Sequence, residues 1–150
     1  MENNIKLLDG SMSFPLELDG YNLNNRLWTG DALINNPEVI KKIHKGYINS
    51  GADYLLTSTY QISYNILKEI GINSEEIKEL FQRSLDLAKE AIVEANTKKD
   101  IKVVASLGPF ASYKKNASEY IGIYDSNDDE IYNFHNNNLN IIKGIDYEII

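Results

Sequence analysis

Polar side chains gather at three places in the sequence where a short apolar run ends. Carboxylate, hydroxyl and amide groups of this kind bind small charged molecules through charge-assisted hydrogen bonds. Each place also has an ordinary structural explanation, because Asp-Gly is common in turns and a strand end that faces water is polar. The three places are Asp9-Gly10, the four hydroxyls and one amide of residues 57–61, and residues 106–110.

The positions of these groups within a repeating pattern favour a shared site. Apolar runs at residues 5–8, 54–58, 101–105 and 145–150 predict four strands with fairly even spacing. Amphipathic stretches between them predict helices, and repeated strand–helix units are typical of a parallel sheet. Both an open doubly wound sheet and a (β/α)8 barrel bind ligands at the carboxyl ends of such strands. The first turn lacks G-x-G-x-x-G, which disfavours a dinucleotide site.

Capping residues predict where the helices begin and end. One helix is expected to start with Asn36 as N-cap and Pro37 in its first turn, and to end at Gly51 in a left-handed conformation. A second helix is expected to start with Ser74 as N-cap of a capping-box pattern, with the acid displaced from the third helical position, and to run through residue 95. Ser126 is the expected cap of a third helix, whose predicted apolar positions are Ile131, Phe134, Leu139, Ile141 and Ile142.

Composition excludes several classes of protein. The chain has 150 residues, a net charge of -7 and no cysteine, so it carries no disulfide framework and no cysteine-based zinc finger. Its acidic balance disfavours a nucleic-acid partner, which needs clustered Lys and Arg. No apolar run approaches the roughly 20 residues needed to cross a membrane. The first four residues show no signal peptide, so the expected compartment is the cytoplasm.

Residues that resemble metal or cation sites have simpler explanations. His44 and His135 lie on predicted helices without a partner at metal-binding spacing, so both are predicted to be structural. The acidic run at residues 125–130 lacks the glycine and the final glutamate of a calcium loop, and it suits a helix N-terminus. Aromatic residues near the strand ends either cover the core or bind a cation through their ring faces. They are Phe14, Trp28, Tyr60, Phe110, Tyr113, Tyr120 and Tyr124.

The length suits one domain and about half of a barrel. No linker divides the chain, so we expect a single domain over residues 1–150. A complete barrel needs about 250 residues, whereas this pattern supplies about three βα units and a fourth strand. The first and fourth strands would then leave open edges. A chain of this kind should associate with itself or with another chain, or fold only partly.

Four segments of the chain are informative when taken in order. The opening segment is Leu8-Asp9-Gly10-Ser11-Met12-Ser13-Phe14-Pro15, and the first helix contains Asn36-Pro37-Glu38-Val39-Ile40. The others are Thr57-Ser58-Thr59-Tyr60-Gln61, and Ser106-Leu107-Gly108-Pro109 with the loop at residues 118–124. Together these segments resemble the homocysteine S-methyltransferase family, in the style of its S-methylmethionine-using branch, and the resemblance runs from about residue 5 to residue 150.

The resemblance implies a fold, a reaction and a set of pocket residues. The implied fold is a (β/α)8 barrel that binds zinc through three cysteine thiolates. The implied reaction moves a methyl group from a sulfonium donor, such as S-methylmethionine, to homocysteine. Asp9 and Gly10 would hold the amino-acid part of homocysteine, with Thr57 and Thr59 lining the pocket. Weaker candidates are Glu17, Tyr60, Gln61, Ser106 and Gly108.

The chain departs from the family at the metal. It holds no cysteine, and the family's zinc ligands lie in the later half of the barrel, so this chain is expected to be inactive alone. The first hypothesis is therefore the N-terminal half of a methyltransferase that needs a missing C-terminal half. The second is a non-catalytic half-barrel that associates through its open edges. The third is an unrelated small α/β binding protein.

Overall fold

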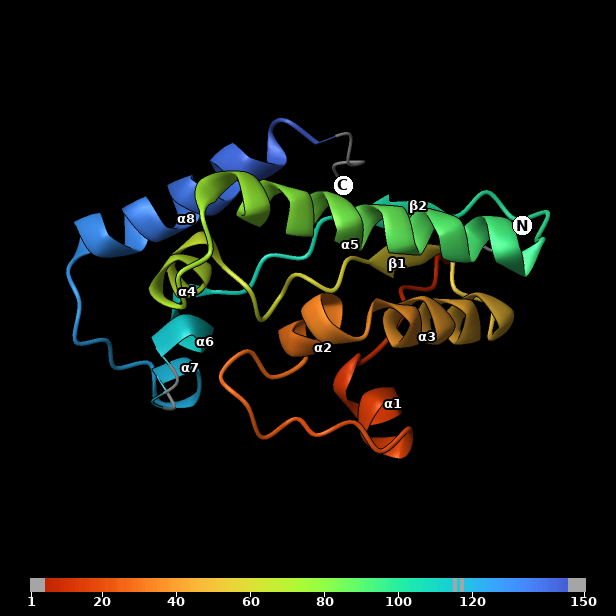
Figure 1. Cartoon of the computed structure of the whole chain (residues 1–150), viewed down its shortest axis with the longest axis horizontal. Helices are drawn as coiled ribbons and strands as arrows, with labels where there is room; N and C mark the ends of the chain where they lie inside the picture. Colours follow the sequence, from red (N-terminus) through yellow and green to blue (C-terminus); the bar gives the residue numbers. More distant parts are fainter. Residues whose placement is uncertain (1–4, 115, 117, 146–150) are drawn as a thin grey trace.

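The computed structural model describes residues 5–114, 116 and 118–145. Helices pack against a small parallel sheet, and α5 runs along most of the molecule (Figure 1). The elements in order are α1 (Ser13–Leu18), α2 (Gly30–Asn35), α3 (Pro37–Asn49), β1 (Tyr54–Leu56), α4 (Tyr64–Glu69), α5 (Ser74–Ala95), β2 (Lys102–Val104), α6 (Phe110–Lys114), α7 (Ser118–Ile121) and α8 (Asp128–Ile142).

The sheet is parallel, as the repeating pattern predicts. β1 and β2 pair with Tyr54 opposite Lys102 and Leu56 opposite Val104. The predicted first strand contributes only a parallel bridge, from Leu8 to Tyr54, although Asp9 N–H also donates to the Tyr54 carbonyl at 2.9 Å. The first segment therefore lies beside β1 on the side opposite β2. Strand β1 thus occupies the centre of a three-segment arrangement.

The predicted strands are longer than the observed ones. The sheet covers Tyr54–Leu56 and Lys102–Val104, where the sequence predicts residues 54–58 and 101–105. One further backbone bond, from Thr57 N–H to the Val104 carbonyl, follows the paired strands, and Ser106 N–H then donates to the Thr57 hydroxyl oxygen instead of to a backbone carbonyl. The predicted fourth strand lies outside the described residues, except for the buried Ile145.

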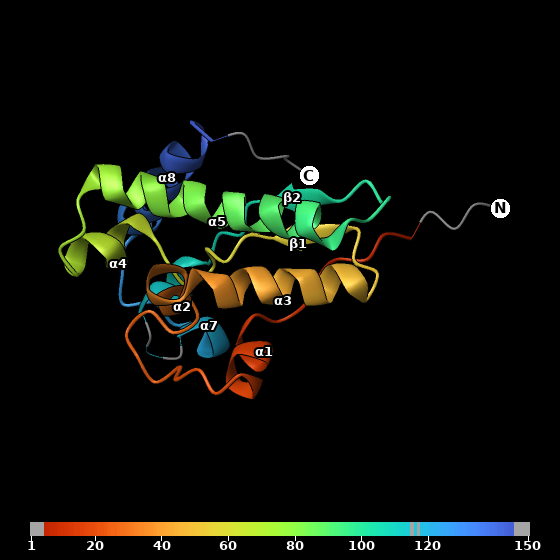
Figure 2. The same cartoon turned by 45° about the vertical axis from the view of Figure 1, so that its right-hand side comes forward.

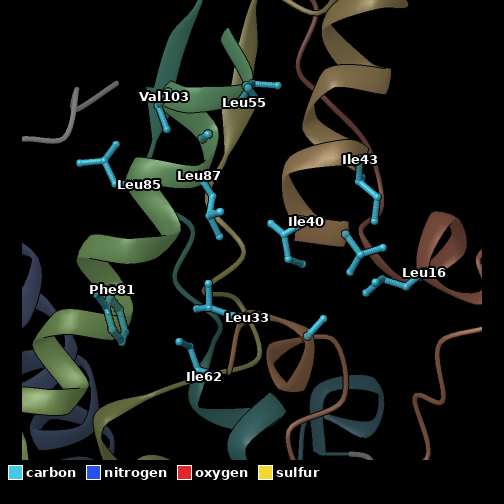
Figure 3. Close-up of a cluster of buried hydrophobic side chains, with 14 of the residues drawn as sticks. Leu16, Leu33, Ile40, Ile43, Leu55, Ile62, Phe81, Leu85, Leu87 and Val103 are labelled. Carbon is cyan, nitrogen blue, oxygen red and sulfur yellow. The ribbon is translucent and has the colours of Figure 1, made fainter. Parts of the chain in front are cut away.

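Helices cover the sheet and enclose the core. α3 and α5 pack against each other, and α5 also contacts β2 (Figure 2). α8 packs on α4 and α5, while α6 and α7 lie beside each other. Figure 3 shows apolar side chains from α5, the strands, α2 and α3 meeting in one cluster. Its fully buried members include Leu33, Ile40, Leu55, Phe81 and Leu85.

The first helix boundary agrees with the sequence, while the N-caps of the two later helices are displaced by one residue. α3 begins at Pro37 as predicted and is followed by Gly51 at φ +100°, although the Asn36 side chain makes no capping bond. The cap of α5 is Asn73 rather than Ser74, and Asn73 and Glu76 complete a capping box. This shift restores the acid at the third helical position.

α8 differs from its prediction in both cap and buried face. Its cap is Asn127, not Ser126, because the Asn127 side chain accepts a hydrogen bond from Glu130 N–H at 2.9 Å. Phe134 is buried as predicted, but Leu139 is 43% exposed. Asn138 is buried instead, and it accepts a hydrogen bond from Tyr64 N–H at 2.8 Å. A polar contact to α4 therefore takes part in positioning this helix.

The long connections after the strands contain short helices. α1 and α2 lie between Asp9 and Pro37, α4 follows β1, and α6 and α7 follow β2. Within the described part of the chain, no helix is both long and apolar enough to cross a bilayer. α1 and α2 adjoin segments that line the cavity described below.

Candidate functional site

A cavity of about 240 Å³ opens at the carboxyl ends of the parallel segments. It brings together the three polar places that the sequence singles out. Its lining comprises Asp9, Gly10, Ser11, Met12, Ser13, Trp28, Thr29, Leu56, Thr57, Ser58, Tyr60, Gln61 and Ser106. Among the predicted site residues, Thr59, Gly108 and Glu17 are not part of this lining.

Asp9 is the charged group of the cavity. Its side chain is 2% exposed, and its Oδ2 accepts a hydrogen bond from Leu56 N–H at 3.0 Å. Its Oδ1 is buried without a hydrogen-bond partner among the described residues. Burial raises the pKa of this carboxyl to about 6, and the Leu56 N–H opposes that rise. Asp9 therefore borders the cavity as a buried carboxylate, one oxygen of which has no hydrogen-bond partner among the described residues.

His44 lies behind Asp9, a contact that the sequence does not predict. The imidazole is fully buried, and its Nδ1 lies 4.0 Å from Asp9 Oδ2. Both ring nitrogens lack a hydrogen-bond partner in the described part of the chain. Burial lowers the pKa of His44 to about 4, so the ring is neutral at physiological pH. The prediction of a structural histidine misses this pairing because 34 intervening residues separate the two groups in sequence.

The two predicted threonines belong to a ring of hydrogen bonds. Ser106 N–H donates to Thr57 Oγ1 at 3.0 Å, and Thr59 Oγ1 donates to the Ser106 carbonyl at 2.6 Å. In the 2.7 Å hydrogen bond between the two hydroxyls, Thr57 is then the donor, because the Thr59 hydroxyl proton already bonds the Ser106 carbonyl. The ring joins the segment after β1 to the segment after β2. Thr57 borders the cavity, whereas the fully buried Thr59 lies behind it.

Both predicted glycines lie where the chain has little room for a side chain. A Cβ at Gly108 would lie 2.1 Å from the Tyr60 carbonyl oxygen, so the loop after β2 packs directly on the loop after β1. A Cβ at Gly10 would lie 3.0 Å from the Tyr47 hydroxyl oxygen. That hydroxyl donates to the Ser11 carbonyl at 2.7 Å and anchors the first loop to α3.

Trp28 borders the cavity in an unusual backbone conformation. Its φ is +50°, a left-handed value that costs free energy for a bulky side chain, and the residue is 41% exposed. Asn25 Nδ2 donates to the Trp28 carbonyl at 3.3 Å. Arg26, two residues away, pairs with Glu69, which also accepts from the Tyr113 hydroxyl. These contacts hold the tryptophan loop against α4 and α6.

The other predicted aromatics are divided between core and surface. Trp28 and Tyr60 border the cavity. Phe14 and Tyr120 are exposed outside it. The remaining three are Phe110, Tyr113 and Tyr124, and the Phe110 ring contacts the other two. Phe134 of α8 stacks on Tyr113, with 5.3 Å between the ring centroids. Only two of the seven therefore lie where a cationic ligand in this cavity would meet their rings.

The described residues do not fit a metal centre. They contain no group of three or more His, Asp or Glu side chains close enough to hold a metal ion, and the whole sequence has no cysteine. The cavity instead offers one buried carboxylate, several hydroxyls and two aromatic rings. Such a set suits a small ligand that carries an ammonium group.

Comparisons with known proteins identify similar sequences and folds. A family model described as "Homocysteine S-methyltransferase" matches residues 6–150. Homocysteine S-methyltransferase YbgG of Bacillus subtilis is 36% identical over 137 residues, which cover 86% of this chain and 43% of that protein. Homocysteine S-methyltransferase of Escherichia coli is 33% identical over 138 residues, covering 89% and 44%.

Solved structures support the same similarity. The metallated form of the homocysteine methyltransferase MmuM from Escherichia coli superimposes with a TM-score of 0.86 at 30% identity. The match covers 99% of this chain and 53% of that chain. The fold is thus an α/β fold shared with about half of that structure. The chain spans less than half the length of the two curated relatives.

Proposed function

The chain belongs to the homocysteine S-methyltransferase family, and on that premise we propose that it forms the homocysteine-binding part of a methyltransferase. The proposed reaction moves a methyl group from a sulfonium donor, such as S-methylmethionine, to homocysteine. The homocysteine sulfur loses its proton and forms a bond to the methyl carbon. The bond from that carbon to the donor sulfonium breaks, which leaves two neutral thioethers; the methylated homocysteine is methionine.

The observation that carries this proposal is the unpartnered oxygen of Asp9 in a carboxylate that borders the cavity. A buried carboxylate with an unpartnered Oδ1 among the described residues is expected to bind an ammonium group strongly, because water competes poorly there. Homocysteine carries such an ammonium. Gly10, which follows Asp9, also lines the cavity. These two residues form the proposed binding point for the amino-acid end of the substrate.

Of the remaining predicted residues, some border the cavity and others lie behind its lining, and we propose a different role for each group. Thr57, Gln61 and Ser106 border the cavity, where polar side chains can meet the substrate carboxylate or sulfur. Thr59 and Gly108 lie outside the lining and hold the two loops together. Glu17 is exposed on α1 and does not border the cavity, so we give it no role.

The donor is proposed to meet the aromatic rings. Trp28 and Tyr60 border the same cavity as Asp9. A sulfonium is a cation, and cations are stabilised over aromatic faces by roughly 0.5–2 kcal/mol. The arrangement supports a homocysteine end near Asp9 and a donor end near Trp28.

Zinc, which the family resemblance implies, does not fit the described residues of this chain, and the whole sequence has no cysteine. We therefore propose that the metal ligands come from a further polypeptide segment, either a C-terminal half or a separate chain. Such a segment would pair with the open edges beside Leu8 and β2, where the described residues provide no strand partner. The cytoplasmic location inferred from the sequence belongs to the same proposal.

Calorimetric titration with L-homocysteine tests the proposed function. We expect binding at pH 7.5 and at least tenfold weaker binding by Asp9→Asn. Binding of 4-mercaptobutanoate, which lacks the ammonium, should also be weak. The matched control is Asp31→Asn, because Asp31 accepts from the Tyr21 hydroxyl away from the cavity, and this variant should bind like the wild type. Equal affinities of the two variants would contradict the proposal.

A reconstitution experiment tests the whole-enzyme part of the proposal. The chain alone should transfer no methyl group from S-methylmethionine. Adding the C-terminal half of a family member, which supplies cysteine thiolates, should restore methionine formation and zinc uptake. A mixture that takes up zinc but forms no methionine would contradict the proposal and would favour a non-catalytic half-barrel.

A further inference from the structure

We propose that His44 is a positioning residue for Asp9, whose Nδ1–H donates to Asp9 Oδ2 when a ligand occupies the cavity and so holds Oδ1 toward the ligand. This inference rests on the proposed function in one respect, because the ligand is taken to carry an ammonium group. Its core is a contact between two buried side chains from different elements.

His44 lacks the hydrogen bonds that a buried ring normally makes. Buried polar side chains nearly always have a partner, yet both nitrogens of this fully buried ring lack one among the described residues. The Nδ1 atom lies 4.0 Å from Asp9 Oδ2. Normal N–H···O bonds reach about 3.2 Å, so a movement of about 1 Å would complete the bond.

The two oxygens of Asp9 have different surroundings. Oδ2 already accepts from Leu56 N–H at 3.0 Å, and it is the oxygen that lies near His44. Oδ1 has no partner in the described part of the chain. A second donor on Oδ2 would fix the plane of the carboxylate and leave Oδ1 as the ligand-binding atom.

The charge states agree with this direction of donation. Burial lowers the pKa of His44 to about 4 and raises the pKa of Asp9 to about 6. At pH 7 the pair is therefore a neutral imidazole beside a carboxylate. A neutral imidazole carries one N–H, and placing it on Nδ1 gives the carboxylate a donor.

Other charged groups near the pair are already paired. Tyr47 is on the same helix as His44, and its hydroxyl donates to the Ser11 carbonyl. Burial and the negative charge of Asp9 raise the pKa of this hydroxyl. The expected pH response therefore belongs to Asp9 and His44. Around α3, the ion pairs are Glu38 with Lys41 within the helix, Asp19 of the α1 C-cap with Lys42, Glu90 and Glu94 of α5 with Lys41, Glu94 with Lys45, and Asp53 before β1 with Lys99.

Two variants separate positioning from packing. His44→Leu fills the space without a donor, and His44→Asn places an amide N–H close to the position of Nδ1. In the ligand-free chain Nδ1 lies 4.0 Å from Asp9 Oδ2, too far for a hydrogen bond, so loss of the donor should leave the pKa of free Asp9 unchanged. Homocysteine affinity should instead fall about fivefold at every pH between about 6.5 and 8.5, because only the ligand-bound state loses a hydrogen bond. His44→Asn should restore the wild-type affinity.

The experiment measures L-homocysteine binding by calorimetry between pH 5 and 8.5 for the wild type and both variants. An unchanged homocysteine affinity in His44→Leu, or an equal loss of affinity in His44→Asn, would overturn the proposal, even if the variants were less stable. Absence of homocysteine binding by the wild type at every pH would instead overturn the proposed function.

Nitrogen NMR of the ligand-free and ligand-bound wild type gives a second test that needs no variant to fold. Long-range 1H–15N spectra should show a protonated Nδ1 and an unprotonated Nε2 for His44. The Nδ1 signal should move when homocysteine binds. A proton on Nε2 would contradict the proposed donation.

Discussion

Replacing Thr59 with valine tests the ring of hydrogen bonds that joins the two loops of the cavity. Valine keeps the shape of this fully buried side chain but removes its hydroxyl. The change deletes the 2.6 Å bond to the Ser106 carbonyl and the 2.7 Å bond from Thr57. Each polar group left buried and unpaired costs about 1–3 kcal/mol. We therefore expect the free energy of unfolding to fall by about 2–4 kcal/mol.

Urea unfolding followed by circular dichroism measures this loss. Thr59→Ser is the matched control, because it keeps the hydroxyl and removes only a methyl group, at a cost of about 1 kcal/mol. The valine variant should therefore be the less stable of the two by at least about 1 kcal/mol. Equal stability of the two variants would refute the stabilising role of the ring.

Three further predictions concern steric room, capping and charge. Gly108→Ala should lower the free energy of unfolding by about 3 kcal/mol, and with it the melting temperature, because its Cβ would lie 2.1 Å from a backbone oxygen. The control Gly46→Ala, in α3, should raise the free energy of unfolding by about 0.5–1 kcal/mol. Asn127→Ala should cost about 1 kcal/mol in urea unfolding and Ser126→Ala less than about 0.5 kcal/mol; equal losses would contradict the observed cap. Asp9→Asn should raise the free energy of unfolding by roughly 1–2 kcal/mol at pH 7 and by little at pH 4. The reason is that burial raises the pKa of the Asp9 carboxyl to about 6, so the folded chain favours the protonated form. A stability difference between variant and wild type that does not depend on pH would refute this.

Local patterns predict the main helices and the parallel sheet. Pro37 and Gly51 determine the ends of α3, since each restricts or permits a particular backbone conformation. The observed N-caps of α5 and α8 each lie one residue from the predicted serine, because asparagine and serine are both good N-caps. In each helix the neighbouring asparagine, Asn73 or Asn127, accepts the hydrogen bond from the helix amides. The sequence thus predicts elements better than their first residues.

The site is predicted only where its residues follow strands. Asp9, Thr57 and Ser106 meet at the cavity because parallel strands end at one edge. His44 belongs to a helix face, and its contact with Asp9 depends on how α3 packs beside the first segment. The left-handed Trp28 likewise depends on contacts between loops. Such tertiary contacts leave no periodic signal in the sequence.

Chemical-shift mapping with L-homocysteine tests the central claim, a homocysteine site built on Asp9, most directly. We predict that backbone amide signals of residues 9–13 and 57–61 move on titration in the wild type and stay unchanged in Asp9→Asn. Saturable shifts confined to these residues would support the claim. Shifts elsewhere, or shifts that persist in Asp9→Asn, would contradict it.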